Sequence, residues 1–176
     1  MILILNKIIF RFCNVKIFPK KIFNIKDDDI INGIQNISLK GRLEEIKSGK
    51  LKTIAGNNRL IVDGGHNISA SLSIANWIKN QNQEVNLIVG MMKDKEHIEF
   101  IKSFRNIVNS ITLIDIPNQD GAISKEDLES KLNDLNLNIK RSQSIESAIK
   151  SLSKNENTII VCIGSLYLAG EILKLN

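Results

Sequence analysis

Aromatic residues are scarce in this chain. They make up 5% of its 176 residues, with one tryptophan and one tyrosine. Proteins that bind single-stranded nucleic acid combine clustered Lys and Arg with aromatic side chains on which bases stack. Here the 24 basic residues are interspersed with 19 acidic ones, apart from a basic segment that precedes Asp27. The net charge of +5 indicates a general attraction to anions, and we expect no nucleic acid partner.

Cysteines and long apolar runs are equally rare. Cys13 and Cys162 are far apart and lack the spacing of a metal-binding motif. Cys162 lies in the apolar run TIIVCIG, which is typical of a buried thiol in a reducing compartment. The opening run MILILNKIIFRF is interrupted by Lys7 and Arg11, is too short to span a bilayer, and lacks the features of a secretory signal. We therefore expect a cytoplasmic protein with no membrane partner.

Apolar strand patterns alternate with amphipathic helix patterns from residue 59 onward. The pattern predicts strands at 59–64, 84–91, 110–117, 136–142 and 158–164, and helices at 68–80, 94–108, 124–135, 144–155 and 165–175. Such alternation builds βαβ units around a mostly parallel sheet. The predicted fold class is α/β, a Rossmann-like three-layer domain with a mostly parallel sheet.

The first third of the chain is less regular. Residues 1–22 have no clean period and are predicted to be an irregular N-terminal segment. Residues 26–37 resemble a short helix with acidic residues at its start, where negative charge is favoured. Residues 40–49 and 50–58 are predicted to be extended segments broken by glycines.

Three polar stretches follow predicted strands. They are Asp63–Asn67, Gly90–Asp94 and Gly164–Tyr167. Ligands of open α/β sheets bind beyond the carboxyl ends of the strands, so these stretches predict a ligand site at one edge of the sheet. The sequence contains neither G-x-G-x-x-G after a strand nor a P-loop for ATP phosphates.

The stretch DGGHN allows two interpretations. As a site, Gly64 and Gly65 would permit close approach of a ligand, and the following helix would direct free N–H groups at an anion. Asp63 could then accept from a ribose, and His66 could bind a phosphate or move a proton. As a purely structural turn, Asn67 would cap the helix and Asp63 would bond within its own loop. The residues alone leave both open.

The remaining polar candidates also have plain structural interpretations. Ser165 could cap the last helix through its hydroxyl. A serine hydrolase triad of Asp63, His66 and Ser165 is disfavoured, because the first two share one loop and GSLY is not a G-x-S-x-G elbow. His97 is predicted to be solvated on a polar helix, and two histidines are too few for a zinc site.

Four motifs together resemble the C-terminal domain of bifunctional folylpolyglutamate synthase/dihydrofolate synthase, a member of the Mur ligase superfamily. They are GRLEEI at 41–46, LIVDGGHN at 60–67, GMMKDKE at 90–96 and GSLYLAGEIL at 164–173, in the family's order and spacing. The resemblance covers about residues 23–176, and implies that this range is a Mur-ligase-type C-terminal domain. It departs at Lys40 and Ile68, where the family often has proline.

The resemblance implies an ATP-dependent acid–amino-acid ligase. In this family ATP phosphorylates the carboxylate of dihydropteroate or a folate, and the amino group of glutamate attacks the acyl phosphate. The C-terminal domain is a lid over ATP, whereas the P-loop and the Mg²⁺ ligands lie in an N-terminal domain. ATP and Mg²⁺ are therefore the expected cofactors. The expected partners are folate or dihydropteroate, glutamate, and an N-terminal ATPase half if it is separately encoded.

The same resemblance implies roles for four residues. Arg42 and Asp63 match nucleotide contacts, and no metal ligand is expected among the matched positions. His66 matches a residue near the reacting phosphate and glutamate, and is the candidate catalytic residue. Ser165 matches a substrate-binding serine on the same rim.

The chain carries the motifs of one half of such an enzyme. Because a P-loop half is absent from these 176 residues, we expect no ligase activity from the chain alone. The alternative is a non-enzymatic gene remnant or an orphan Rossmann-like binding domain, which the irregular residues 1–22 would suit.

Overall fold

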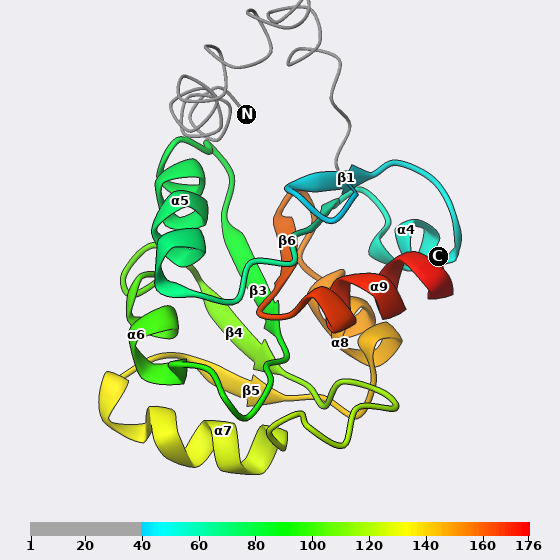
Figure 1. The fold of residues 1–176 in the computed structure, drawn as a ribbon. Helices are drawn as coiled ribbons and strands as arrows, with labels where there is room; N and C mark the ends of the chain where they lie inside the picture. The colour runs from blue at the N-terminus through cyan, green and yellow to red at the C-terminus, as the bar shows by residue number, and fades with distance from the viewer. Residues whose placement is uncertain (1–39) are drawn as a thin grey trace, which may run out of the picture. The chain divides into compact units, whose positions relative to one another are not determined.

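The described part of the chain is a six-stranded sheet between two layers of helices (Figure 1). The computed structural model describes residues 40–176, so the predictions for residues 1–22 and 26–37 lie outside the described residues. The strands are β1 (Glu44–Ile46), β2 (Arg59–Val62), β3 (Val85–Val89), β4 (Ser110–Leu113), β5 (Ile139–Arg141) and β6 (Ile159–Ile163). Their order is β1-β2-β6-β3-β4-β5, with β1 antiparallel to β2 and the other pairs parallel. The predicted α/β class is confirmed.

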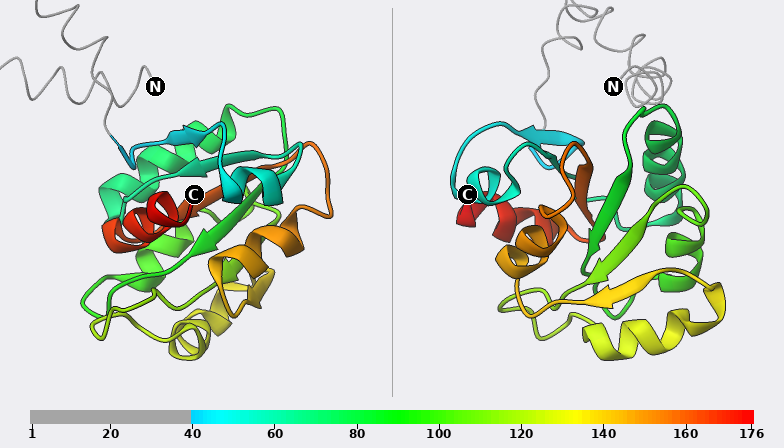
Figure 2. Two further views of the ribbon diagram at one scale, coloured as in Figure 1. Left: turned by 90° about the vertical axis from the view of Figure 1, so that its right-hand side faces the viewer. Right: turned by 180° about the vertical axis from the view of Figure 1, so that it is seen from behind.

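Helices cover both faces of the sheet (Figure 2). One layer contains α5 (Ile68–Lys79), α6 (His97–Lys102) and α7 (Lys125–Leu132), which runs into the 3₁₀ turn η1 (Asn133–Leu135); the other contains α4 (Lys50–Ala55), α8 (Ile145–Leu152) and α9 (Leu166–Leu175). Side chains alternate along β3, so Leu87 and Val89 pack in the core of the first layer and Ile88 in that of the second. No described helix is long and apolar enough to cross a bilayer.

The strand order creates a switch point at β6. The chain passes from β2 through β3 and β4 to β5 with its helices on one face, then returns through α8 on the other face and places β6 between β2 and β3. The loops after β2 and β3 lead to the first layer, whereas the loop after β6 leads to α9 in the second. Loops that diverge in this way open a crevice at the carboxyl ends of the strands.

The prediction of an extended segment at residues 50–58 was wrong, because Lys50–Ala55 forms α4. Leu51 and Ala55 lie four residues apart, the spacing of one helix face, and both are fully buried in the second core. Elsewhere the elements are shorter than predicted. The predicted helix 94–108 is confined to α6, since turns follow it and Asn106 has a φ of 61°.

Asn176 caps α4 from the other end of the domain. Gly49, at the N-cap position, has no side chain to accept a bond. Asn176 Oδ1 accepts instead from the backbone N–H of Leu51 at 3.1 Å and of Lys52 at 3.3 Å, and its Nδ2 donates to the Ser48 carbonyl at 2.8 Å. Orphan donors of the first helical turn are thereby satisfied by a distant residue.

Replacing Asn176 by Ala is expected to lower the free energy of unfolding by about 1 kcal/mol, the usual cost of losing a helix cap. Asn176→Asp is the matched control. It keeps an acceptor and adds a negative charge where the helix favours one, so it should retain most of the stability. Urea unfolding followed by circular dichroism measures both. If Asn176→Ala is as stable as the unchanged chain, the contact with α4 contributes nothing.

Candidate functional site

An open pocket of about 540 Å³ occupies the crevice beside β6. Its lining consists of His66, Met92, Lys93, Asp94, Lys95, Gly121, Ser165, Leu166 and Tyr167. The three polar stretches that follow β2, β3 and β6 therefore all contribute to one cavity. This is the convergence that the switch point and the strand ends predict.

His66 and Ser165 lie in this pocket. The His66 Nδ1 atom is 2.9 Å from the Gly64 carbonyl oxygen. Because a carbonyl only accepts, Nδ1 carries the proton of this bond, and Nε2 stays available for a ligand. Ser165 is 2% exposed and caps α9, since its Oγ accepts from the Tyr167 N–H at 3.1 Å. Its hydroxyl proton can still be donated into the pocket.

Asp63 lies behind the pocket and does not line it. It is 4% exposed, its Oδ1 accepts from the Gly65 N–H at 2.6 Å, and its Oδ2 accepts from the Leu43 N–H at 2.8 Å. Burial raises the pKa of Asp63, while these two hydrogen bonds and the nearby Arg42 oppose that rise. Asp63 thus bonds within its own loop, as the structural interpretation predicts, and also ties that loop to the segment before β1.

Asn67 completes this structural interpretation. It is the N-cap residue of α5, and its side chain accepts from the Ala70 N–H at 2.9 Å. The helix after DGGHN consequently begins where the sequence places it. The capping role and a ligand-facing role of the loop are compatible, because the cap does not use the His66 side chain.

Arg42 is exposed and borders the pocket without lining it. A Cβ atom built on Gly64 would lie 3.1 Å from Arg42 Nη1 and 2.3 Å from Leu166 Cδ2. The guanidinium therefore lies over the glycine turn, next to a residue of the pocket rim. Its bond from Nη1 to the Gly41 carbonyl is long at 3.5 Å, so among residues 40–176 most of its donors have no partner and could serve an anion.

Backbone hydrogen bonds join the loops at this edge. The Gly64 N–H donates to Gly41 O at 2.8 Å, and the Gly164 N–H donates to Gly65 O at 3.0 Å. Gly164 has a φ of 109°, and a Cβ atom there would lie 2.7 Å from the Gly90 carbonyl oxygen. Only glycine fits this position, because both the dihedral angle and the close backbone approach exclude a side chain.

The positive charge of the pocket comes partly from residues that the sequence did not single out. Lys93 and Asp94 belong to a predicted stretch, Lys95 lies in the motif GMMKDKE but was given no role, and Gly121 was missed. Lys95 pairs with the exposed Asp94 at 2.6 Å and, together with His66, lowers the pKa of that carboxyl. Gly121 lies in the long segment between β4 and α7, where no motif indicates a site.

The prediction that His97 is solvated was wrong. His97 is 4% exposed, and its Nε2 is 3.0 Å from the carbonyl oxygen of Met92, a pocket residue. Lys95, Glu96 and Glu99 lie close to it in the sequence, which suggested an exposed helix face. Burial arises because the loop before α6 folds back over the ring.

The described residues do not form a metal site by themselves. Within residues 40–176 no group of three His, Cys, Asp or Glu side chains is placed to hold an ion. The pocket presents lysines and a histidine instead, which suit anionic groups.

The family model for the C-terminal domain of dihydrofolate synthetase matches residues 46–175 of the chain. The chain belongs to this family. A curated relative, the probable dihydrofolate synthetase of Schizosaccharomyces pombe, is 22% identical over 169 residues, which cover 86% of this chain and 38% of the relative. The chain thus spans well under half of that relative's length.

Two solved structures of synthases show the same fold. The bifunctional folylpolyglutamate synthase/dihydrofolate synthase of Yersinia pestis, complexed with AMPPNP and Mn ion, matches with a TM-score of 0.70 and 20% identity over 85% of this chain and 34% of its own. Folylpolyglutamate synthase of Mycobacterium tuberculosis, complexed with ADP and AMPPCP, matches with a TM-score of 0.70 and 17% identity over 86% and 35%. About two thirds of each solved chain therefore has no counterpart in these residues.

Replacing Asp63 by Asn is expected to lower the free energy of unfolding by about 1–3 kcal/mol. The amide of Asn can accept only through its oxygen, so it leaves one of two backbone N–H groups facing another donor. Chemical denaturation measures the change. Asp94→Asn, at an exposed position of the same edge, is the control and should stay within about 0.5 kcal/mol of the unchanged chain. Equal stability of both variants would show that the Asp63 bonds do not hold the loops.

Proposed function

We propose that residues 40–176 form the lid half of an ATP-dependent ligase that adds glutamate to dihydropteroate or folate through an acyl phosphate. The observation that carries the proposal is the convergence of His66, Ser165 and two lysines in the switch-point pocket of a dihydrofolate synthetase C-terminal domain. The nucleotides bound in the two solved synthases support a nucleotide as one of the ligands.

Each candidate residue has a role that its surroundings permit. The free donors of Arg42 would stabilise charge on the phosphoryl oxygens of ATP. Asp63 would act by fixing the Gly64–Gly65 backbone beneath the nucleotide. His66, whose Nε2 has no partner among residues 40–176, would serve near the reacting phosphate and the amino group of glutamate. The Ser165 hydroxyl, which lines the same pocket, would bind substrate.

The described residues supply only part of what the reaction needs. Lys93 and Lys95 attract anions, but the sequence contains no P-loop to hold the β- and γ-phosphates, and residues 40–176 hold no carboxylate cluster for Mg²⁺. Both would come from an N-terminal ATPase half, which corresponds to the part of the relatives that this chain does not match. Leu166 and Tyr167, 50% and 55% exposed on the pocket rim, suit coverage by that half.

The chain alone is expected to form no dihydrofolate from dihydropteroate, glutamate and Mg-ATP, because its sequence contains no P-loop to hold the β- and γ-phosphates. Product detection by mass spectrometry checks this, with an intact bifunctional synthase as the positive control. Turnover by the chain alone would refute its assignment as half of a site. Nucleotide binding without turnover, even with an N-terminal half added, would favour the orphan binding domain.

With an N-terminal half supplied, Arg42→Ala is expected to lower kcat/KM for ATP by about 10²-fold, the usual effect of removing one electrostatic donor. His66→Ala should act mainly on kcat, since the imidazole would act at the reacting groups. Lys79→Ala, an exposed position at the far end of α5, is the control and should leave the kinetics unchanged. Unaltered kinetics in Arg42→Ala would remove Arg42 from the nucleotide site.

A further inference from the structure

His97 stands behind one wall of the pocket, the loop Met92–Lys95. It is the first residue of α6, and its Nε2 lies 3.0 Å from the Met92 carbonyl oxygen. That bond requires a proton on Nε2, because the carbonyl can only accept. The His97 N–H also donates to Lys95 O at 3.0 Å. The loop is therefore folded back onto the start of α6, with the imidazole inside the fold.

The same wall is held from the side by backbone bonds. The Lys93 N–H donates to Gly121 O at 2.9 Å, and the Ile123 N–H donates to Met91 O at 3.0 Å. Met92 and Ala122 thus form an isolated antiparallel β-bridge. These bonds do not change with pH in the neutral range, whereas the His97 bond involves a titratable ring.

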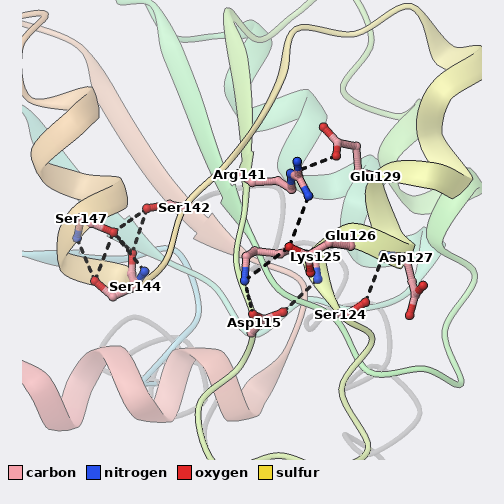
Figure 3. A network of polar contacts seen from close by, with 10 residues as sticks. All are labelled: Asp115, Ser124, Lys125, Glu126, Asp127, Glu129, Arg141, Ser142, Ser144 and Ser147. Atoms are coloured by element: carbon pink, nitrogen blue, oxygen red, sulfur yellow. Dashed lines mark hydrogen bonds and ion pairs between the residues drawn. The ribbon is translucent and has the colours of Figure 1, made fainter.

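The supporting segment is anchored where it enters α7 (Figure 3). Lys125 is buried and pairs through Nζ with Asp115, whose Oδ1 also accepts the Lys125 N–H at 2.9 Å. Arg141 of β5 joins Glu126 at 3.3 Å and Glu129 at 3.1 Å on the same helix. The segment that bonds Met91 and Lys93 is therefore held in place by ion pairs at the start of α7. Of these contacts to the wall, the His97 bond is the one that involves a group titrating near neutral pH.

The surroundings of His97 favour its neutral form. Burial lowers the pKa of His97, and Lys131 of α7 lowers it further, while the bond to Met92 and the carboxylate of Asp94 act in the opposite direction. Protonation would place a charge in a poorly hydrated position beside Lys131 and at the N-terminus of a helix, where cations are disfavoured. Protonation adds a proton at Nδ1 and keeps the Nε2–H donor to Met92, so the closed wall is weakened by the buried charge and not by loss of that donor.

We propose that His97 is a positioning residue of the pocket: its neutral imidazole holds the Met92–Lys95 wall in place, and its protonation makes that closed position less stable. His97 acts through the Met92 carbonyl and lines no part of the cavity itself. A loss of ligase activity in mild acid would follow from a weakened pocket wall, and this consequence rests on the proposed function. The tether, which is the hydrogen bond from His97 to the Met92 carbonyl, does not depend on that function.

The sign of the pH effect follows from the lowered pKa. Above the unfolded-state value of about 6.5 both folded and unfolded chains carry a neutral His97, and the full stabilisation is present. As the pH falls below about 6.5, the unfolded or opened chain binds the proton before the closed one does. The closed wall therefore loses stability progressively between that value and the lower pKa of the buried ring.

Hydrogen–deuterium exchange of the whole chain tests the tether. His97→Leu removes the donor at similar volume, and the amides of residues 92–97 should lose about tenfold protection at pH 7.5 while β3 keeps its own. His97→Gln can still donate to Met92 but does not titrate, and it should retain the protection. Ile98→Ala changes an exposed neighbour on α6 and is the matched control.

The pH series decides the proposal even if His97→Leu fails to fold. Protection of residues 92–97, corrected for intrinsic exchange, should fall between pH 7.5 and 5.5 in the unchanged chain and stay level in His97→Gln. Equal pH dependence in both, or full protection in a folded His97→Leu, would overturn the assignment. This exchange measurement does not depend on ligase turnover. If the chain and an added N-terminal half form no product while the His97 bond still protects residues 92–97, the proposed function is rejected and the role of His97 stands.

Discussion

The carboxyl edge of the sheet depends on the two hydrogen bonds that the buried carboxylate of Asp63 accepts. This carboxylate receives one backbone N–H from its own glycine turn and one from the segment before β1. Taking a carboxylate out of water is costly, and charge-assisted hydrogen bonds offset that cost only when the donors are held in place. Further backbone bonds, from Gly64 to Gly41 and from Gly164 to Gly65, extend the same connection to β6. The position of the pocket follows from this set of contacts.

In this arrangement the residues that hold the loops are not the residues that reach solvent. Asp63 and His97 are buried and hold loops, while His66, Arg42 and the rim residues Leu166 and Tyr167 reach solvent. A domain built in this way presents a shaped surface whose polar groups are already oriented. It suits a component that closes on a ligand held by another protein domain, because little further ordering is needed when the two meet.

The fold was largely predictable from the sequence because its central strands are short and apolar. All residues of β3 and β6 are buried, and apart from Asn86 they are apolar, so both strands are predicted from apolar runs between helix patterns. The site was predictable only in outline. Polar stretches after strands indicated the edge, but Asp63 in a glycine turn suits a ligand contact and a loop tether equally well. Two features had no local signal: α4 is capped by a residue 125 positions away, and His97 is buried by a loop that folds over it.

The place of β6 in the sheet has a consequence for biosynthesis. It is translated after the other five described strands, yet it lies between β2 and β3 and pairs with both. While a ribosome makes the intervening residues, the inner edges of β2 and β3 have no native partner. Unpaired apolar strand edges are prone to wrong pairings. A nascent chain of this design is exposed to aggregation until β6 emerges, and a premature stop before residue 159 would remove the middle of the sheet rather than its margin.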